Sequence, residues 1–433
     1  MKTLYVVHCI DTEGPLTEDI VDTFNRIKSI YNLDLEPTKK NLSLLQNKKI
    51  NINGLEDAVA ETLKPSLLEY NNNWDQIDKM LNTCLSKNFR EKMLDDFGSG
   101  WIYSWHCMDH INYKENPRQK DIGYGKIFNF YKEKLIKTKS LNDEINWHFH
   151  PRAINDDDLS CGTSYTNSYS SLNYLLCRRV IDDKWFPVVN RPGFHSERQD
   201  SHLFLEQWIP FDYANQSNDE INNQVDLNNH RFGDWNRASR SWRGYHPSHN
   251  DYQLKGECNR KIFRCLNVGT RFNNININHI DEAFKETEKY GKSILSFCNH
   301  DYRDISKDVE YMRNLLQIKK KEFPDIKLKF AGAQEAAIKL NGKISIRPEI
   351  KIEIKDNCLH INLVKGKIFG PQPFLALKHK SGNYYHDNLD IVLPEKSWSY
   401  IFDSQSFNLN ELDSVGVGSA GNNGLYSVEV IKL

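Results

Sequence analysis

The chain begins with LYVVHCIDTEG, residues 4–14, and this stretch decides how the rest is interpreted. Leu4 to Ile10 form a short apolar run rich in β-forming residues, which is typical of a buried strand. The run stops at Asp11 and Glu13, which face the same way if the strand continues that far. Active sites of α/β proteins lie at the carboxyl ends of parallel strands, so both acids are candidate functional residues. The alternative is an acidic turn without a function.

Strand-like and helix-like segments alternate along the first 340 residues. Strand-like runs lie near 101–107, 145–149, 185–189, 211–214 and 293–298, and helical spacing occurs at 127–136, 280–290 and 308–323. Alternation of this kind predicts a parallel sheet or barrel. Residues 17–97 show helical spacing, which predicts helices inserted after the first strand.

The pattern changes near the end of the chain. From about residue 345, apolar residues alternate with polar ones, with Gly, Asn and Pro between the runs. This pattern is typical of a small antiparallel β-sandwich. For a chain of 433 residues we therefore expect two domains, a barrel at 1–340 and a sandwich at 345–433.

Composition excludes several classes of protein. Apolar residues make up 39% of the chain, which excludes general disorder. The 57 basic and 58 acidic residues leave a formal charge of −1, which disfavours a nucleic-acid partner. No apolar run approaches the ~20 residues of a membrane span, and no signal peptide is recognisable. Nine cysteines without CxxC pairs are interpreted as reduced thiols, so we expect a cytoplasmic protein.

A pair of histidines ends a second predicted strand, in EINWHFHP at residues 144–151. His148 and His150 fall on one strand face and Trp147 on the other, so two imidazoles point the same way. A carboxylate and two imidazoles form a suitable ligand set for a divalent metal such as Zn²⁺. The alternative is a pair of structural histidines.

Two further motifs follow predicted strands. Arg191, in NRPGFH at 190–195, directly follows the strand 185–189 and can hold a carboxylate through its fork of donors. His300, in NHDYRD at 299–304, stands beside Asp301 and is a candidate general acid.

In their order along the chain, these four motifs resemble those of the NodB-type polysaccharide deacetylases, a superfamily of metal-dependent carbohydrate esterases. The resemblance covers about residues 1–335 and implies an irregular (β/α) barrel of about seven strands. It also implies roles: Asp11 as the catalytic base, Arg191 as the residue that positions it, His300 as the general acid, and Glu13 and His148 as metal ligands.

The chain departs from the family pattern at the third ligand. The family places a second histidine four residues after the first, where this chain has Arg152, so His150 is taken as the substitute. Asp109, Trp235 and Asp301 are assigned to substrate binding, because they belong to polar or aromatic segments suited to a sugar.

The leading hypothesis is a cytoplasmic metal-dependent hydrolase, with zinc as the expected ion, that removes an acetyl group from an N-acetylated sugar of a glycan or glycan precursor. Two alternatives remain. One is a catalytically inactive glycan-binding protein on the same barrel. The other is a metal-independent glycosidase that uses paired carboxylates.

Overall fold

Strand β1, at Thr3–Thr12, lies at the centre of the main sheet and is buried along its whole length. In this computed structural model, which describes residues 1–111, 116, 118–153, 164–219, 224–227, 232–342 and 346–433, β1 has three parallel neighbours. They are β2 at Tyr103–Cys107, β8 at Lys292–His300 and, along the first residues of β1, β9 at Lys327–Phe330. A strand buried on both faces is mostly apolar, which explains the opening run of the sequence.

The parallel strands form a nearly closed barrel. Their order is β6-β5-β4-β3-β2-β1-β8-β7. The remaining bounds are Glu144–Phe149 for β3, Val189–Pro192 for β4, Phe211–Asn215 for β5, Lys261–Arg264 for β6 and Leu266–Asn267 for β7. Only Cys265 separates β6, which pairs with β5, from β7, which pairs with β8, so one short segment links the two edges. The predicted mixed α/β fold with a parallel barrel is confirmed.

Helices accompany the barrel strands. They are α7 at Lys126–Lys137, α8 at Tyr169–Ile181, α9 at His202–Trp208, α10 at Ile277–Tyr290, α11 at Ser306–Glu322 and α12 at Ala333–Asn341. Their apolar faces contribute to two large cores. One core contains β1, β2 and β8 residues with α7, α10 and α11, and the other contains β3, β4 and β5 residues with α8, α9 and α12.

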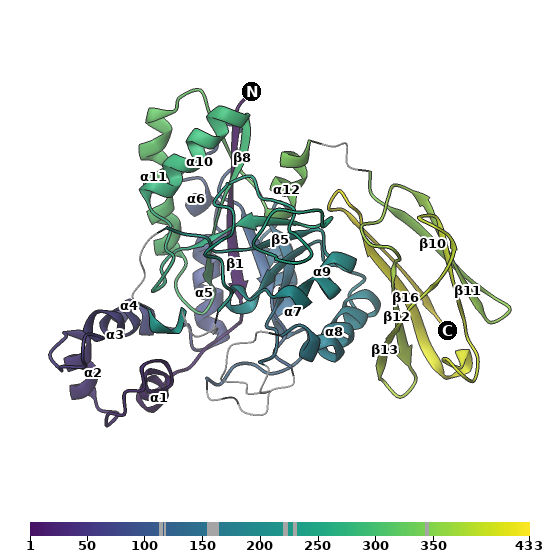
Figure 1. Ribbon diagram of the computed structural model, residues 1–433, viewed down its shortest axis with the longest axis horizontal. Coiled ribbons are helices and arrows are strands. Elements are labelled where there is room, and N and C mark those ends of the chain that lie inside the picture. The colour runs from purple at the N-terminus through teal and green to yellow at the C-terminus, as the bar shows by residue number, and fades with distance from the viewer. Residues whose placement is uncertain (112–115, 117, 154–163, 220–223, 228–231, 343–345) are drawn as a thin grey trace.

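Six helices lie between β1 and β2: α1 at Ile20–Tyr31, α2 at Lys39–Gln46, α3 at Glu56–Thr62, α4 at Pro65–Leu68, α5 at Trp74–Cys84 and α6 at Lys87–Arg90. Helices α1 to α4 project from the barrel as a lobe (Figure 1) and bury a small apolar core of their own. The phenol of Tyr31 on α1 donates to Gln224 Oε1 at 2.6 Å, which ties this lobe to a distant barrel loop.

The C-terminal part consists of two four-stranded antiparallel sheets. The first, in the order β10-β11-β15-β14, contains Glu349–Lys355, Cys358–Lys365, Ser397–Ile401 and Asp390–Leu393. The second, in the order β13-β12-β16-β17, contains Tyr384–Asp387, Phe374–His379, Leu412–Ala420 and Tyr426–Lys432. Apolar side chains of both sheets share one core, and α8 packs against the second sheet. Gly418 permits this contact, since a Cβ there would meet Val180 of α8 at 2.9 Å.

One strand was placed wrongly from the sequence. The segment 185–189 was expected to be a strand, but β4 spans Val189–Pro192, so Arg191 lies within a strand and not after it. The apolar run indicated burial, but pairing with β3 decides which residues form the strand. Residues 147–149 of β3 pair with residues 190–192.

Two other expectations concern cysteines and membranes. All eight described cysteines are free, and Cys161 lies outside the described residues. None of the described helices has the length and apolar character that crossing a membrane requires.

Burial of His8 inside the barrel predicts a pH-dependent stability. Burial lowers the pKa of His8 to about 3, and its ring is satisfied in the neutral form, with Nδ1 accepting from Trp101 and Nε2 facing Asn299 Oδ1. Between that pKa and the ordinary histidine pKa of about 6.5, only the unfolded chain gains the proton, so stability falls as the pH drops below about 6.5.

The free energy of unfolding, measured with a denaturant at about pH 7 and at about pH 5, should therefore fall less in His8→Gln than in the wild type. The difference between the two proteins should reach up to ~1.4 kcal/mol per pH unit. The exposed His360 on β11 offers a matched control, His360→Gln, which should keep the wild-type slope. Equal slopes in all three proteins would contradict the prediction.

Candidate metal centre and active site

The carboxyl ends of the barrel strands open into a cavity of about 430 Å³. Asp11, Glu13, His148, His150 and His300 all line it. These residues come from β1, β3 and β8 or from the residues that follow those strands. Strand direction in a parallel barrel therefore brings together motifs that lie far apart in the sequence.

A buried ion pair crosses the barrel interior beneath this cavity. Arg191 Nε donates to Asp11 Oδ1 at 2.5 Å, and Arg191 Nη2 donates to Asp11 Oδ2 at 2.8 Å. Burial alone would raise the pKa of Asp11, but Arg191, through its charge and its hydrogen bonds, holds this pKa below its ordinary value. Asp11 is consequently an oriented, ionised carboxylate.

Three side chains form a group that could hold a metal ion. One ligand atom from each of Glu13, His148 and His150 lies within 4.8 Å of the others. The Nε2 atoms of the two histidines are 3.1 Å apart, and His150 Nε2 is 3.6 Å from Glu13 Oε1. The predicted ligand group is thus confirmed as a geometric cluster.

The protonation of these residues fits a metal. His148 Nδ1 donates to the backbone oxygen of Arg191 at 2.6 Å, which leaves Nε2 with its lone pair facing His150. Burial lowers the pKa of His148 to about 4, so the ring is neutral near pH 7. Despite its burial, Glu13 has a pKa well below its ordinary value because Lys120 lies beside it. One carboxylate and two imidazoles are a donor set that suits Zn²⁺.

The turn after β4 is strained where it meets these ligands. Phe194 and His195 have φ values of 55° and 50°, a left-handed conformation that costs ~1–3 kcal/mol per residue. Gly193 has no side chain at the point where a Cβ would overlap the ring of His150. The turn thereby allows His150 to lie beside His148, and it directs Phe194 and His195 to the cavity.

His300 completes the group at the end of β8. Its Nε2 lies 3.8 Å from Asp11 Oδ2 and 3.8 Å from Glu13 Oε1, and its ring stacks on Tyr302 at 4.7 Å. Its Nδ1 is buried without a hydrogen-bond partner among the described residues. Burial lowers the pKa of His300 to about 4.

The three residues assigned to sugar binding lie in different surroundings. Asp109 lines the cavity, but both its carboxylate oxygens are engaged, by Arg179 at 2.6 Å and by the Gly125 amide at 2.6 Å. Trp235 packs among apolar residues, and its indole donates to the His195 carbonyl. Asp301 is fully buried and accepts the backbone amides of Glu13 and Gly14. Neither Trp235 nor Asp301 lines the cavity, so we assign them no contact with substrate.

Sequence reasoning missed several residues of the site. Lys120 contacts Glu13 Oε2. His195 Nδ1 accepts from Arg191 Nη2 at 3.3 Å. His195 stood within a quoted motif, but a single lysine in a loop carries no signal, because its partner lies 107 residues away.

Comparisons with known proteins do not identify a family. No protein-family model matches the chain, and no curated protein matches it. Among solved structures, a superoxide reductase from Giardia intestinalis matches 21% of this chain over 100% of its own length, with 16% identity and a TM-score of 0.16. A likeness this small supports no conclusion about fold or function.

The ligand assignment makes a prediction for single variants. His148→Ala and His150→Ala should each lose bound metal, because a three-residue ligand set becomes incomplete, whereas Arg152→Ala should retain it. Elemental analysis of the purified proteins measures this difference. Loss of metal from Arg152→Ala, or full occupancy in His150→Ala, would refute the choice of His150.

Gly193→Ala should weaken metal binding about 10- to 100-fold by displacing the His150 ring, as changes to groups that orient ligands typically do. A competition titration with a chelator measures the affinity, and circular dichroism verifies the fold. Unchanged affinity in a folded variant would show that the turn does not position His150.

Proposed function

We propose that the protein is a metal-dependent hydrolase that removes an acetyl group from an N-acetylated sugar, on a barrel of the polysaccharide deacetylase type. The observation that carries the proposal is the meeting of Asp11, Glu13, His148, His150 and His300 at one cavity, above the Asp11–Arg191 ion pair. Their order along the chain is that of the family the motifs resemble.

Glu13, His148 and His150 would hold the ion, with zinc proposed from the nitrogen-rich donor set. When bound, such an ion supplies a Lewis acid that polarises the acyl carbonyl and acidifies the attacking water. Lys120 lies against Glu13 Oε2, so Oε1, which faces His150, is the oxygen left to the ion.

Asp11 takes the proton of the attacking water in this mechanism. Its two oxygens accept from Arg191, so the carboxylate cannot rotate, and its low pKa keeps it ionised before the reaction. Arg191 thus positions the base and does not itself contact the substrate, since it does not line the cavity.

His300 delivers a proton to the departing amine nitrogen. With a pKa of about 4, it begins the reaction neutral near pH 7 and must first gain a proton. Asp11 Oδ2, 3.8 Å from His300 Nε2, is the neighbouring group that has just accepted one. The proton removed from water at Asp11 therefore returns to the amine through His300.

The glycosidase alternative has weaker support. A glycosidase needs one carboxylic acid that is protonated at its working pH, which requires a raised pKa. Arg191 and Lys120 instead hold the pKa values of Asp11 and Glu13 below the ordinary range despite burial. Activity that survives a chelator would nevertheless favour the glycosidase, and stable glycan binding without turnover would favour the inactive binding protein.

The cytoplasm is the proposed compartment, because the eight described cysteines are free thiols. A glycan or glycan precursor made in that compartment is then the proposed substrate.

Replacing the base tests the mechanism. Asp11→Asn should keep the metal but lose deacetylase activity by a factor on the order of 10²–10⁴, because an amide cannot accept the water's proton. Acetate release from an N-acetylated glycan and metal content are measured together, with Asp390→Asn on the distant β14 as the control. Wild-type activity in Asp11→Asn would exclude Asp11 as the base, and loss of the ion would make Asp11 a ligand.

A further inference from the structure

Arg303 is a firmly held cation in the wall of the active-site cavity. Its Nε donates to the backbone oxygen of Leu67 at 3.3 Å. Its guanidinium carbon lies 5.0 Å from the ring centroid of Tyr302 and 5.6 Å from that of Tyr70. Side chains this constrained lose little entropy when they bind a ligand.

The inserted helices maintain this position. Leu67 lies on α4 and Tyr70 follows that helix. The next residue, Asn71, bonds to the loop after β8, which carries Arg303. The Asn71 amide donates to the Tyr302 carbonyl at 2.8 Å, and its side chain donates to the Asp301 carbonyl at 2.8 Å. Contacts from the inserted helices and from the end of β8 therefore keep Arg303 in place.

The charge of Arg303 has no counterion among the described residues. The neighbouring acids have other partners: Asp304 accepts from the Ser306 amide at 3.0 Å, and Asp308 accepts from Asn299 at 2.8 Å. Two other arginines of the cavity differ, since Arg26 and Arg118 both bind Glu18, at 2.7 and 2.6 Å. The guanidinium of Arg303 is half-buried, and apart from the bond of its Nε to Leu67 its donors have no hydrogen-bond partner among the described residues. These donors are left for an anionic ligand in the cavity.

Arg303 also lies close to the reacting groups. Arg303 and His300 both contact the ring of Tyr302: the guanidinium carbon lies 5.0 Å from its centroid, and the His300 ring stacks on it at 4.7 Å. A group on the sugar at the metal centre, or on the next sugar unit, can therefore reach the guanidinium.

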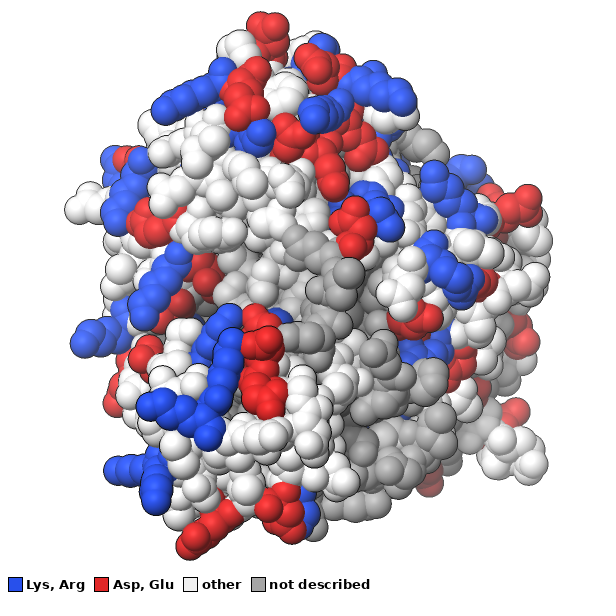
Figure 2. Space-filling model, turned by 60° about the vertical axis from the view of Figure 1, so that its left-hand side comes forward, with Lys and Arg blue, Asp and Glu red and all other residues white. Residues whose placement is uncertain are grey.

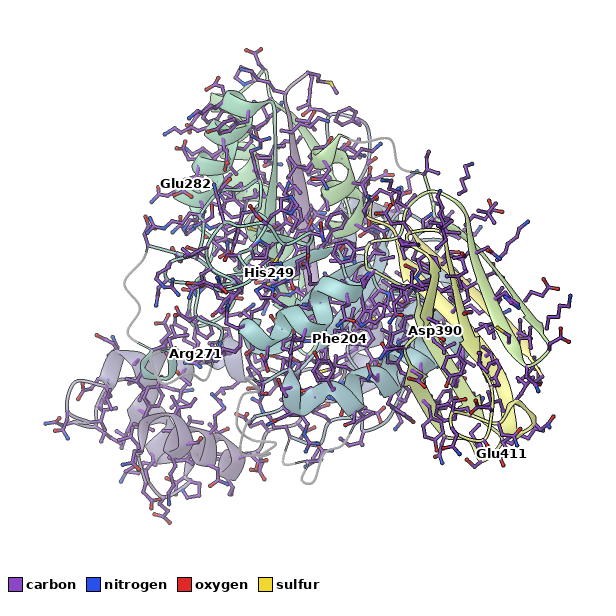
Figure 3. The ribbon with its side chains drawn as sticks, turned by 45° about the vertical axis from the view of Figure 1, so that its right-hand side comes forward. Phe204, His249, Arg271, Glu282, Asp390 and Glu411 are labelled. Carbon is purple, nitrogen blue, oxygen red and sulfur yellow. The ribbon has the colours of Figure 1, made fainter. Side chains whose placement is uncertain are left out.

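A second arginine also lines the cavity wall, and it bonds to Gln224. Arg271 lies where the inserted helices meet the barrel (Figure 3), with its guanidinium 5.0 Å from the Phe272 ring and 5.7 Å from the Phe232 ring. Basic and acidic side chains are interspersed on the face drawn in Figure 2, so no broad field of one sign covers that face. Attraction of an anion must come from these individual cavity residues.

We propose that the substrate is an anionic N-acylated sugar and that Arg303 binds its phosphate or carboxylate group. The planar fork of arginine matches both groups. This inference rests on the proposed deacetylase function and specifies its substrate class.

The test compares kcat/KM of the metal-loaded enzyme for three probes: N-acetylglucosamine, its 1-phosphate and N-acetylmuramic acid. We expect the wild type to prefer an anionic probe. Arg303→Gln should reduce the ratio of anionic to neutral kcat/KM about 10- to 100-fold, mainly through KM, as expected for a lost charged hydrogen bond. Arg303→Lys should restore part of the ratio.

The exposed Arg240, which does not line the cavity, provides the charge-matched control Arg240→Gln, and this variant should keep the wild-type ratio. A preference for the 1-phosphate would identify the bound group as a phosphate, and a preference for N-acetylmuramic acid would identify it as a carboxylate. An unchanged ratio in Arg303→Gln would overturn the inference while leaving the deacetylase proposal intact.

Calorimetric binding of the same probes separates the two proposals. If no probe is hydrolysed, the deacetylase function fails, yet weaker binding of the anionic probe by Arg303→Gln than by the wild type would still support the anion site. Equal binding by both proteins would contradict it.

Discussion

The ion pair between Asp11 and Arg191 is the interaction on which the site depends. It joins the end of β1 to β4 across the barrel interior, and the Arg191 backbone oxygen also accepts the bond that orients His148. Two charges buried this deeply are costly unless both remain paired, and removing one partner typically costs ~3–5 kcal/mol. The barrel can bury this pair because Arg191 also donates to the Tyr213 carbonyl. One arginine thereby connects the proposed base, a proposed metal ligand and the sheet.

Other residues of the site adopt backbone conformations that cost stability but place the side chains of the site. Phe194 and His195 hold left-handed backbone conformations, and Gly193 leaves space for the His150 ring. Such strain persists where the surrounding structure compensates for it, and it is concentrated at functional sites. Asp301 directly follows β8, beside the end of β1, and its carboxylate fixes the backbone amides of Glu13 and Gly14. It thereby positions Glu13, a proposed metal ligand.

The additions to the barrel have separate effects on the cavity. Near one wall, Glu18, which precedes α1, binds Arg26 of α1 and Arg118 from the chain after β2, and Leu67 of α4 holds Arg303. On another side, α8 carries Arg179, which binds Asp109 in the cavity wall, while the second C-terminal sheet packs against the same helix. This sheet therefore supports the cavity wall through α8 without lining the cavity.

The sequence by itself determined the class of fold and the positions of the principal site residues. Apolar runs that end in Asp11, His148 or His300 are local signals, and strand direction in a parallel barrel brings their ends to one edge. Only the tertiary structure decided that β4 extends through Arg191, that Lys120 lies against Glu13 and that Arg303 lacks a counterion among the described residues. These facts depend on strand register and on contacts between residues far apart in the chain. Local periodicity reports burial but carries no information about which distant side chain will be the partner.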